Sequence, residues 1–92
     1  MKVIAVGHLL EAKENYPGTA DAINGWLQIL TNSDFHSAQE LTETFPRVTS
    51  EGDFYYFPLA SLPLQICARI DFPSKVVLVN HVQPARDIVR RN

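Results

Sequence analysis

The sequence predicts an α+β domain in which an N-terminal strand and two to three helices pack on one face of a mostly antiparallel sheet. Two observations support this prediction. Apolar residues follow a helical spacing through residue 46 and then change to a two-residue alternation. The last two expected strands are joined by a very short connection, which requires antiparallel pairing. We therefore expect a single domain over residues 1–92 with the element order β-α-α-(α)-β-β-β.

The first half begins with a short β-branched strand and continues into helices. Residues 2–6 are expected to form the strand, which Gly7 ends. Residues 8–16 suit a helix that a proline-glycine pair stops. Thr19 is the expected N-cap of a second helix. Its core face has the spacing i, i+3, i+4 and i+7 and consists of Ile23, Trp26, Leu27 and Leu30.

A short third helix is expected from Ser37 to about Phe45, where a proline ends it. Ser37 and Glu40 have the spacing of a capping box, in which the serine oxygen accepts from the Glu40 amide and the glutamate side chain reaches back. The residues expected to face inward are Ala38, Leu41 and Phe45.

Strand patterns occupy the second half. Residues 62–72 alternate between apolar and other side chains and give the strongest strand signal in the chain. Residues 73–75 make a tight turn. Residues 76–82 are apolar on both faces except for Asn80 and His81, as expected for a strand inside a sheet.

An aromatic run at residues 54–57 is a further expected strand. Such a run could offer a surface on which RNA bases stack. The alternative is that Phe57 and Tyr55, or their alternates, pack in the core beside Trp26. We favour the core, because one of the two strand faces must cover the helices.

The composition is that of an ordinary globular chain, with 46% hydrophobic and 20% charged residues among 92. No apolar run approaches the roughly 18 to 20 residues of a membrane span, and the first residues lack the form of a secretion signal. The single Cys67 is expected to pack as a small hydrophobe. Three histidines on separate segments give no metal-ligand spacing. We therefore expect a cytoplasmic protein without metal or cofactor.

The charge argues against a generic nucleic-acid binder. The net charge is −2 and the pI about 5.8, whereas nucleic-acid-binding domains are normally basic. The charges are unevenly distributed, with two basic against six acidic residues through residue 46 and six basic against four acidic after it. Any surface that faces RNA is therefore expected in the second half.

Two stretches carry a recognisable pattern: SDFHSAQELTETFP, residues 33–46, and FYYFPLASLPLQICARIDFPSKVVLVNHV, residues 54–82. They resemble the HigB family of ribosome-dependent mRNA-cleaving toxins, in the RelE superfamily. The first stretch matches an acidic-aromatic pair, a Lys/His-Ser-Pro-x-x-Leu pattern with Ala38 in place of the proline, and a helix-ending Phe-Pro. The Tyr16-Pro17 pair matches an early break usual in the family. The resemblance covers nearly the whole chain and implies a RelE-like fold.

The catalytic part of the pattern differs from that of the family. Where the family has a Gly-Asn turn followed closely by an arginine, this chain has ASLPLQ, residues 60–65, so that Gln65 stands at the arginine position. Where the family ends with Thr-His-x-Glu-Tyr-Asp, this chain has QPARDI, residues 83–88. The resemblance therefore implies a degenerate catalytic motif.

Two functions remain as alternatives. In the first, the chain is a toxin that enters the ribosomal A site, cleaves mRNA as an endoribonuclease, and is held silent by a cognate helix-turn-helix antitoxin. In the second, it is a catalytically inactive relative that acts as a protein- or RNA-binding regulatory module. The acidic net charge and the replaced motif favour the second, and the nearly full-length match favours the first.

His81 and Arg69 are the candidate catalytic residues if the chain is an enzyme. A histidine ordinarily gains and loses a proton near neutral pH, and an arginine could hold a phosphate. The alternative for His81 is a structural side chain that shares a face with Val77 and Val79 and donates to a backbone carbonyl. The alternative for Arg69 is an ion pair with Asp71 or with an acid on a neighbouring strand.

Gln65 and the terminal arginines are the candidate RNA-binding residues. Gln65 and Arg69 are four apart in an alternating strand, so both should point away from the core. Arg86, Arg90 and Arg91 could contact rRNA or mRNA phosphates, each contact adding salt-dependent affinity. Equally, cations are favoured at a helix C-terminus and are common at chain ends.

Overall fold

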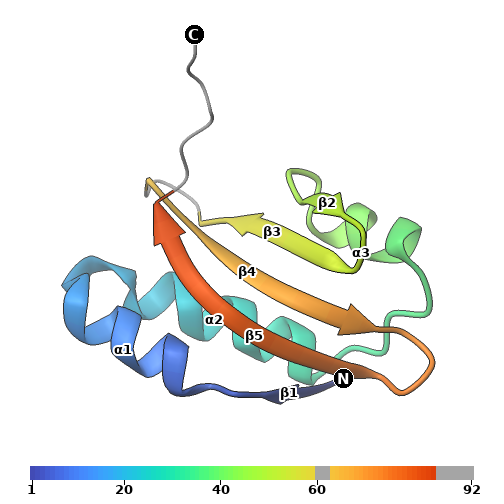
Figure 1. Cartoon of the computed structure of the whole chain (residues 1–92), viewed down its shortest axis with the longest axis horizontal. Helices are drawn as coiled ribbons and strands as arrows, with labels where there is room; N and C mark the ends of the chain where they lie inside the picture. Colours follow the sequence, from blue (N-terminus) through green and yellow to red (C-terminus); the bar gives the residue numbers. More distant parts are fainter. Residues whose placement is uncertain (60–62, 85–92) are drawn as a thin grey trace, which may run out of the picture.

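The computed structural model describes residues 1–59 and 63–84 and has the α+β architecture that the sequence predicts (Figure 1). A strand opens the chain, helices follow, and strands complete it. The elements in chain order are β1 (Lys2–Ile4), α1 (Gly7–Asn15), a 3-10 turn (Pro17–Thr19), α2 (Ala20–Thr31), α3 (Ala38–Thr44), β2 (Thr49–Glu51), β3 (Phe54–Pro58), β4 (Leu64–Asp71) and β5 (Val76–Pro84).

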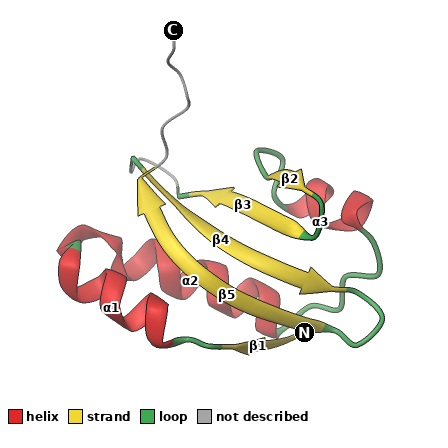
Figure 2. Cartoon of the chain, in the orientation of Figure 1, coloured by secondary structure: helices red, strands yellow, loops and turns green. Residues whose placement is uncertain are grey.

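The five strands form one mixed sheet in the order β1-β5-β4-β3-β2 (Figure 2). β1 runs parallel to β5, and the other three pairings are antiparallel. The short turn between β4 and β5 confirms the expected hairpin. The sequence does not predict the edge strand β2, because its three residues are all exposed and so carry no alternation.

The helices α1 and α2 lie across one face of the sheet (Figure 1), and α3 precedes β2 in the chain. The predicted core face of α2 is confirmed, since Ile23, Trp26 and Leu30 are buried and Leu27 is partly buried against them. No helix in the described part of the chain is long and apolar enough to cross a membrane.

Aromatic rings hold α2 and the residue after α3 onto β3. The Phe57 ring meets Trp26 edge to face, with centroids 5.4 Å apart, and meets Phe45 in the same way at 5.1 Å. Such pairs contribute about 0.5–1.5 kcal/mol beyond the area they bury. Phe57 and Tyr55 are 1% and 8% exposed, which confirms their predicted place in the core.

The junction between β1 and α1 and the start of α2 differ from the sequence prediction. β1 ends earlier than expected, at Ile4, because Ala5 takes a left-handed backbone conformation with φ of 61° and turns the chain into α1. Gly7 begins that helix instead of ending the strand. Thr19 precedes α2 but does not cap it, because its buried hydroxyl donates to the Tyr16 carbonyl at 2.8 Å, just after α1. The carbonyls at a helix end lack intrahelical donors, and the hydroxyl supplies one near that end.

The start of α3 follows the predicted capping box in part. The Ser37 hydroxyl oxygen accepts from the Glu40 amide at 3.3 Å, as expected. The Glu40 carboxylate reaches back one residue further than the motif requires and accepts from the His36 amide at 2.9 Å. Leu41 is fully buried, but Ala38 is exposed rather than inward. Ala38 is the first residue of the helix, and its Cβ is tilted toward the exposed N-terminal end.

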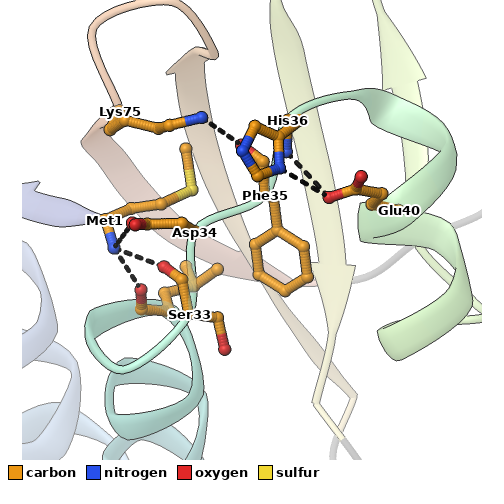
Figure 3. A network of polar contacts seen from close by, with 8 residues as sticks. Met1, Ser33, Asp34, Phe35, His36, Glu40 and Lys75 are labelled. Carbon is orange, nitrogen blue, oxygen red and sulfur yellow. Dashed lines mark hydrogen bonds and ion pairs between the residues drawn. The ribbon is translucent and has the colours of Figure 1, made fainter.

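A polar network joins the start of β1 to the end of α2 (Figure 3). The Met1 ammonium donates to the carbonyls of Leu30, at 2.9 Å, and of Ser33, and lies 3.4 Å from a carboxylate oxygen of Asp34. The C-terminal end of a helix carries unpaired carbonyls and partial negative charge, which a cation satisfies. The network therefore fixes β1 at the edge of the sheet against the end of α2.

We predict that Leu30→Ala lowers the free energy of unfolding by about 2–5 kcal/mol, because the Leu30 side chain is fully buried and its loss leaves a cavity. The matched change Leu10→Ala, at a helical leucine that is 57% exposed, should change it by less than about 0.5 kcal/mol. Urea unfolding followed by circular dichroism measures both. Equal effects at the two positions would contradict the packing of α2 described here.

Candidate functional site on the open face of the sheet

One face of the sheet is not covered by the described helices, and we call it the open face. Successive side chains of a strand point to opposite faces, and residues paired across strands share a face. The buried Leu64, Ile66 and Ala68 of β4 point to the helices, so the residues between them point away. The open face carries Lys2, Ile4, Thr49, Glu51, Phe54, Tyr56, Pro58, Gln65, Cys67, Arg69, Asp71, Val76, Leu78, His81 and Gln83.

A β-bulge places His81 on this face. Cys67 pairs with His81 while Ala68 pairs with Val79, so Asn80 is one extra residue on β5. If the side chains of β5 alternated without interruption, His81 would point to the helix side with Val79, as the sequence alone suggests. The extra residue reverses this. His81 is exposed, and the partner of its Nε2 in the described chain is the Gln83 side-chain oxygen at 2.5 Å, not a backbone carbonyl.

Arg69 is exposed on the open face and lies beside a carboxylate. Its guanidinium is 3.6 Å from Asp53, in the turn between β2 and β3, so the expected pairing with a nearby acid is confirmed with Asp53 in place of Asp71. The turn makes this possible. Gly52 has φ of 63°, a conformation that favours glycine, and the two-residue loop it opens presents Asp53 next to the Phe54–Arg69 pair.

The other predicted RNA-binding residues divide into two groups. Gln65 is half-buried on the open face, opposite Gln83, and this confirms that Gln65 and Arg69 share a face. Arg86, Arg90 and Arg91 lie outside the described residues. The structure therefore brings Gln65, Arg69 and His81 onto one face, in neighbouring rows of the sheet.

Cys67 and Tyr56 occupy the middle of the open face, in the row of His81. Burial raises the pKa of the Cys67 thiol, and hydrogen bonds with Tyr56 and Asn80 oppose that shift. Partial desolvation raises the pKa of Tyr56 as well, with Cys67 and Glu51 acting in the same direction. Both groups therefore keep their protons at neutral pH, and neither is a ready general base.

A shallow hollow of about 370 Å³ lies on the open face near the β4–β5 turn. We call its floor and rim the hairpin patch. His81 is not among the residues that line this hollow. The patch consists of Ile4, Asp53, Arg69, Asp71, Val76 and Leu78.

Cleavage of RNA by its own 2′-hydroxyl needs a group that takes a proton, a group that gives one, and positive charge near the phosphate. His81 is an acid-base group on the open face. The positive charge of Arg69 is opposed by Asp53 and Asp71, which would repel a phosphate. Removing one preorganised donor typically costs about 10²- to 10³-fold in rate. Among residues 1–59 and 63–84, no group of three metal-ligating side chains offers a substitute for that charge.

The sequence did not single out Asp53 or Leu78 as functional candidates, and it indicated Tyr56 only as part of the aromatic run at residues 54–57, on which bases could stack. Asp53 could be found as an acid beside a glycine in a hairpin turn, but its pairing with Arg69 requires the strand register. Tyr56 and Leu78 sit in apolar runs, and their facing becomes clear only when the helix side of the sheet is known.

The resemblance to the HigB family depends on the motifs in residues 33–46 and 54–82. No family model and no curated protein matches the chain.

We predict that Cys67 reacts with a thiol reagent about tenfold or more slowly in the folded chain than in urea, because the residue is 3% exposed and burial raises the pKa of its thiol. Tyr56→Ala removes a neighbouring side chain and should speed the reaction in the folded state. Labelling kinetics at neutral pH measure both rates. Full-rate labelling of the folded chain would show that Cys67 is accessible.

Proposed function

We propose that the chain is a HigB-like domain of the RelE superfamily that works as a protein-binding regulatory module and no longer cleaves mRNA. The observation that carries this proposal is the charge around Arg69. Its guanidinium is 3.6 Å from Asp53 and lines a hollow together with Asp71, so two carboxylates accompany one cation there.

The protonation states of the open face support the same function. Tyr56 and Cys67 have raised pKa values and hold their protons at neutral pH, so neither supplies a general base beside His81. His81 is engaged with Gln83, and the hollow beside Arg69 does not include it.

Ribosome-dependent mRNA cleavage is the second candidate, and one specific observation favours it. The bulge at Asn80 turns His81 to the face that carries Arg69 and Gln65. In this case His81 and Arg69 would act in catalysis, and Gln65, Arg86, Arg90 and Arg91 would contact RNA. The ribosome and mRNA would then be partners.

The proposed protein partner is a cognate helix-turn-helix antitoxin, in the cytoplasm. Such proteins bind DNA and are rich in basic residues, which suits a chain with a net charge of −2. A reading frame for such a protein beside the gene for this chain would support the pairing.

We predict that induction of the chain in bacteria leaves growth and ribosome-bound mRNA unchanged, because the cation at the candidate site, Arg69, is opposed by Asp53 and Asp71. Growth curves and mapping of mRNA ends measure the outcome, with circular dichroism of the purified chain to show that it is folded.

A matched pair of histidine variants separates the two candidate functions. Growth arrest with cut mRNA that disappears in His81→Ala and persists in His8→Ala, at an exposed histidine on α1, would overturn the proposal and establish cleavage. Binding of the purified chain to the neighbouring helix-turn-helix protein, measured by titration calorimetry, is the expected positive result.

A further inference from the structure

The open face is unusually apolar at the hairpin patch. A sheet with one covered face normally alternates apolar residues toward the core with polar residues toward solvent. β5 breaks this rule, because Val76 and Leu78 face outward while Val77 and Val79 are buried on the helix side. Ile4 of β1 lies next to Leu78 in the register and is 37% exposed. No described element covers these three aliphatic side chains.

Carboxylates rim this apolar floor. Asp71 is held in place because its carboxylate accepts from the Ser74 amide at 3.2 Å and from the Ser74 hydroxyl. Asp53, in the turn between β2 and β3, lies 3.6 Å from the Arg69 guanidinium. Arg69 is thus the single cation that lines the hollow, against two acids.

Lys2 is the other cation on the open face near the patch. It pairs with Val76, which in turn pairs with Asp71, so Lys2 and Asp71 are separated by the width of β5. Two strand spacings separate their backbones by roughly 9–10 Å, and no ion pair joins Lys2 to Asp71 among the described residues. Asp71 therefore has no cation within ion-pairing distance among the described residues, and its charge is available to an incoming group.

We propose that the hairpin patch binds a protein segment in which a large apolar side chain lies close to a lysine or arginine. The apolar side chain packs on Ile4, Val76 and Leu78, and the cation pairs with Asp71. The contact buries aliphatic area, which favours association and must offset the entropy lost when the two partners are ordered.

Charge complementarity selects this occupant over two others. A nucleic-acid strand would bring phosphates against Asp53 and Asp71. A second copy of the chain would bring the same two carboxylates, and like charges placed together disfavour such an interface. A basic, apolar segment has neither problem. This inference rests on the proposed binding function and adds to it the contact surface and the chemistry of the partner.

The test is a titration of the isotope-labelled full chain with a short synthetic peptide that alternates leucine with lysine, followed by nuclear magnetic resonance. We expect amide shifts in β1, β5 and the β4–β5 turn. A matched peptide that alternates leucine with glutamate should bind much more weakly, because it lacks a partner for Asp71.

Variants of the chain locate the contact. Leu78→Glu should weaken binding of the leucine-lysine peptide by about tenfold or more, and Leu10→Glu, at an exposed leucine on α1, should leave it unchanged. Asp71→Asn keeps an oxygen that can accept from Ser74 and so preserves the turn. It should weaken binding by about two- to fivefold at low salt and have little effect at high salt.

Several outcomes would overturn the inference. Shifts elsewhere on the chain, or equal affinity for Leu78→Glu and Leu10→Glu, would place binding outside the patch. Concentration-dependent dimers that Leu78→Glu disrupts, seen by sedimentation, would make a second copy the occupant. Tighter peptide binding after Arg90→Gln with Arg91→Gln would make the chain's own C-terminal residues the occupant.

Failure of this inference is distinguishable from failure of the proposed function. Growth arrest with cut mRNA overturns the proposed function whatever the titration gives. If Leu78→Glu leaves the affinity for the leucine-lysine peptide unchanged, and the chain does not arrest growth, only the role of the hairpin patch is overturned.

Discussion

The contact between α2 and β3 through Trp26 and Phe57 determines which side chains of the sheet meet solvent. Side chains alternate along a strand, so once Phe57 points to the helix, its neighbours on β3 must point away. Register carries this choice across the sheet, because Phe57 pairs with Ile66 and Ile66 pairs with Val82. One aromatic contact thus sets which side chains of three strands point to the helices. The side chains that point the other way form the open face.

The bulge at Asn80 divides the open face into two parts with different chemistry. On one side of it lie aliphatic residues and the acids of the hairpin patch. On the other side lie Gln65, His81 and Gln83, which can donate and accept hydrogen bonds. The extra residue lets β5 keep Val82 partly buried against the core while His81 is turned outward.

Arg69 by itself indicates phosphate binding, whereas the carboxylates beside it disfavour a phosphate. An arginine on an exposed strand face is a natural phosphate ligand. The turn that Gly52 opens brings Asp53 to within 3.6 Å of the guanidinium, and Asp71 adds a second carboxylate to the same hollow. A face with this balance suits a basic protein segment better than RNA, which is why we favour a binding function over catalysis.

The sequence by itself determined the fold class, the order of the main elements and the core face of α2, because apolar periodicity reports directly which residues are buried. Ile23, Trp26 and Leu30, and the alternation along β4, needed no tertiary information. The short exposed strand β2 and the end of β1 at Ala5 had no such periodicity to reveal them. Only the tertiary structure decided that His81 faces outward and that Arg69 pairs with Asp53. Both facts depend on register, and a single inserted residue or a two-residue turn changes register without leaving a periodic trace in the sequence.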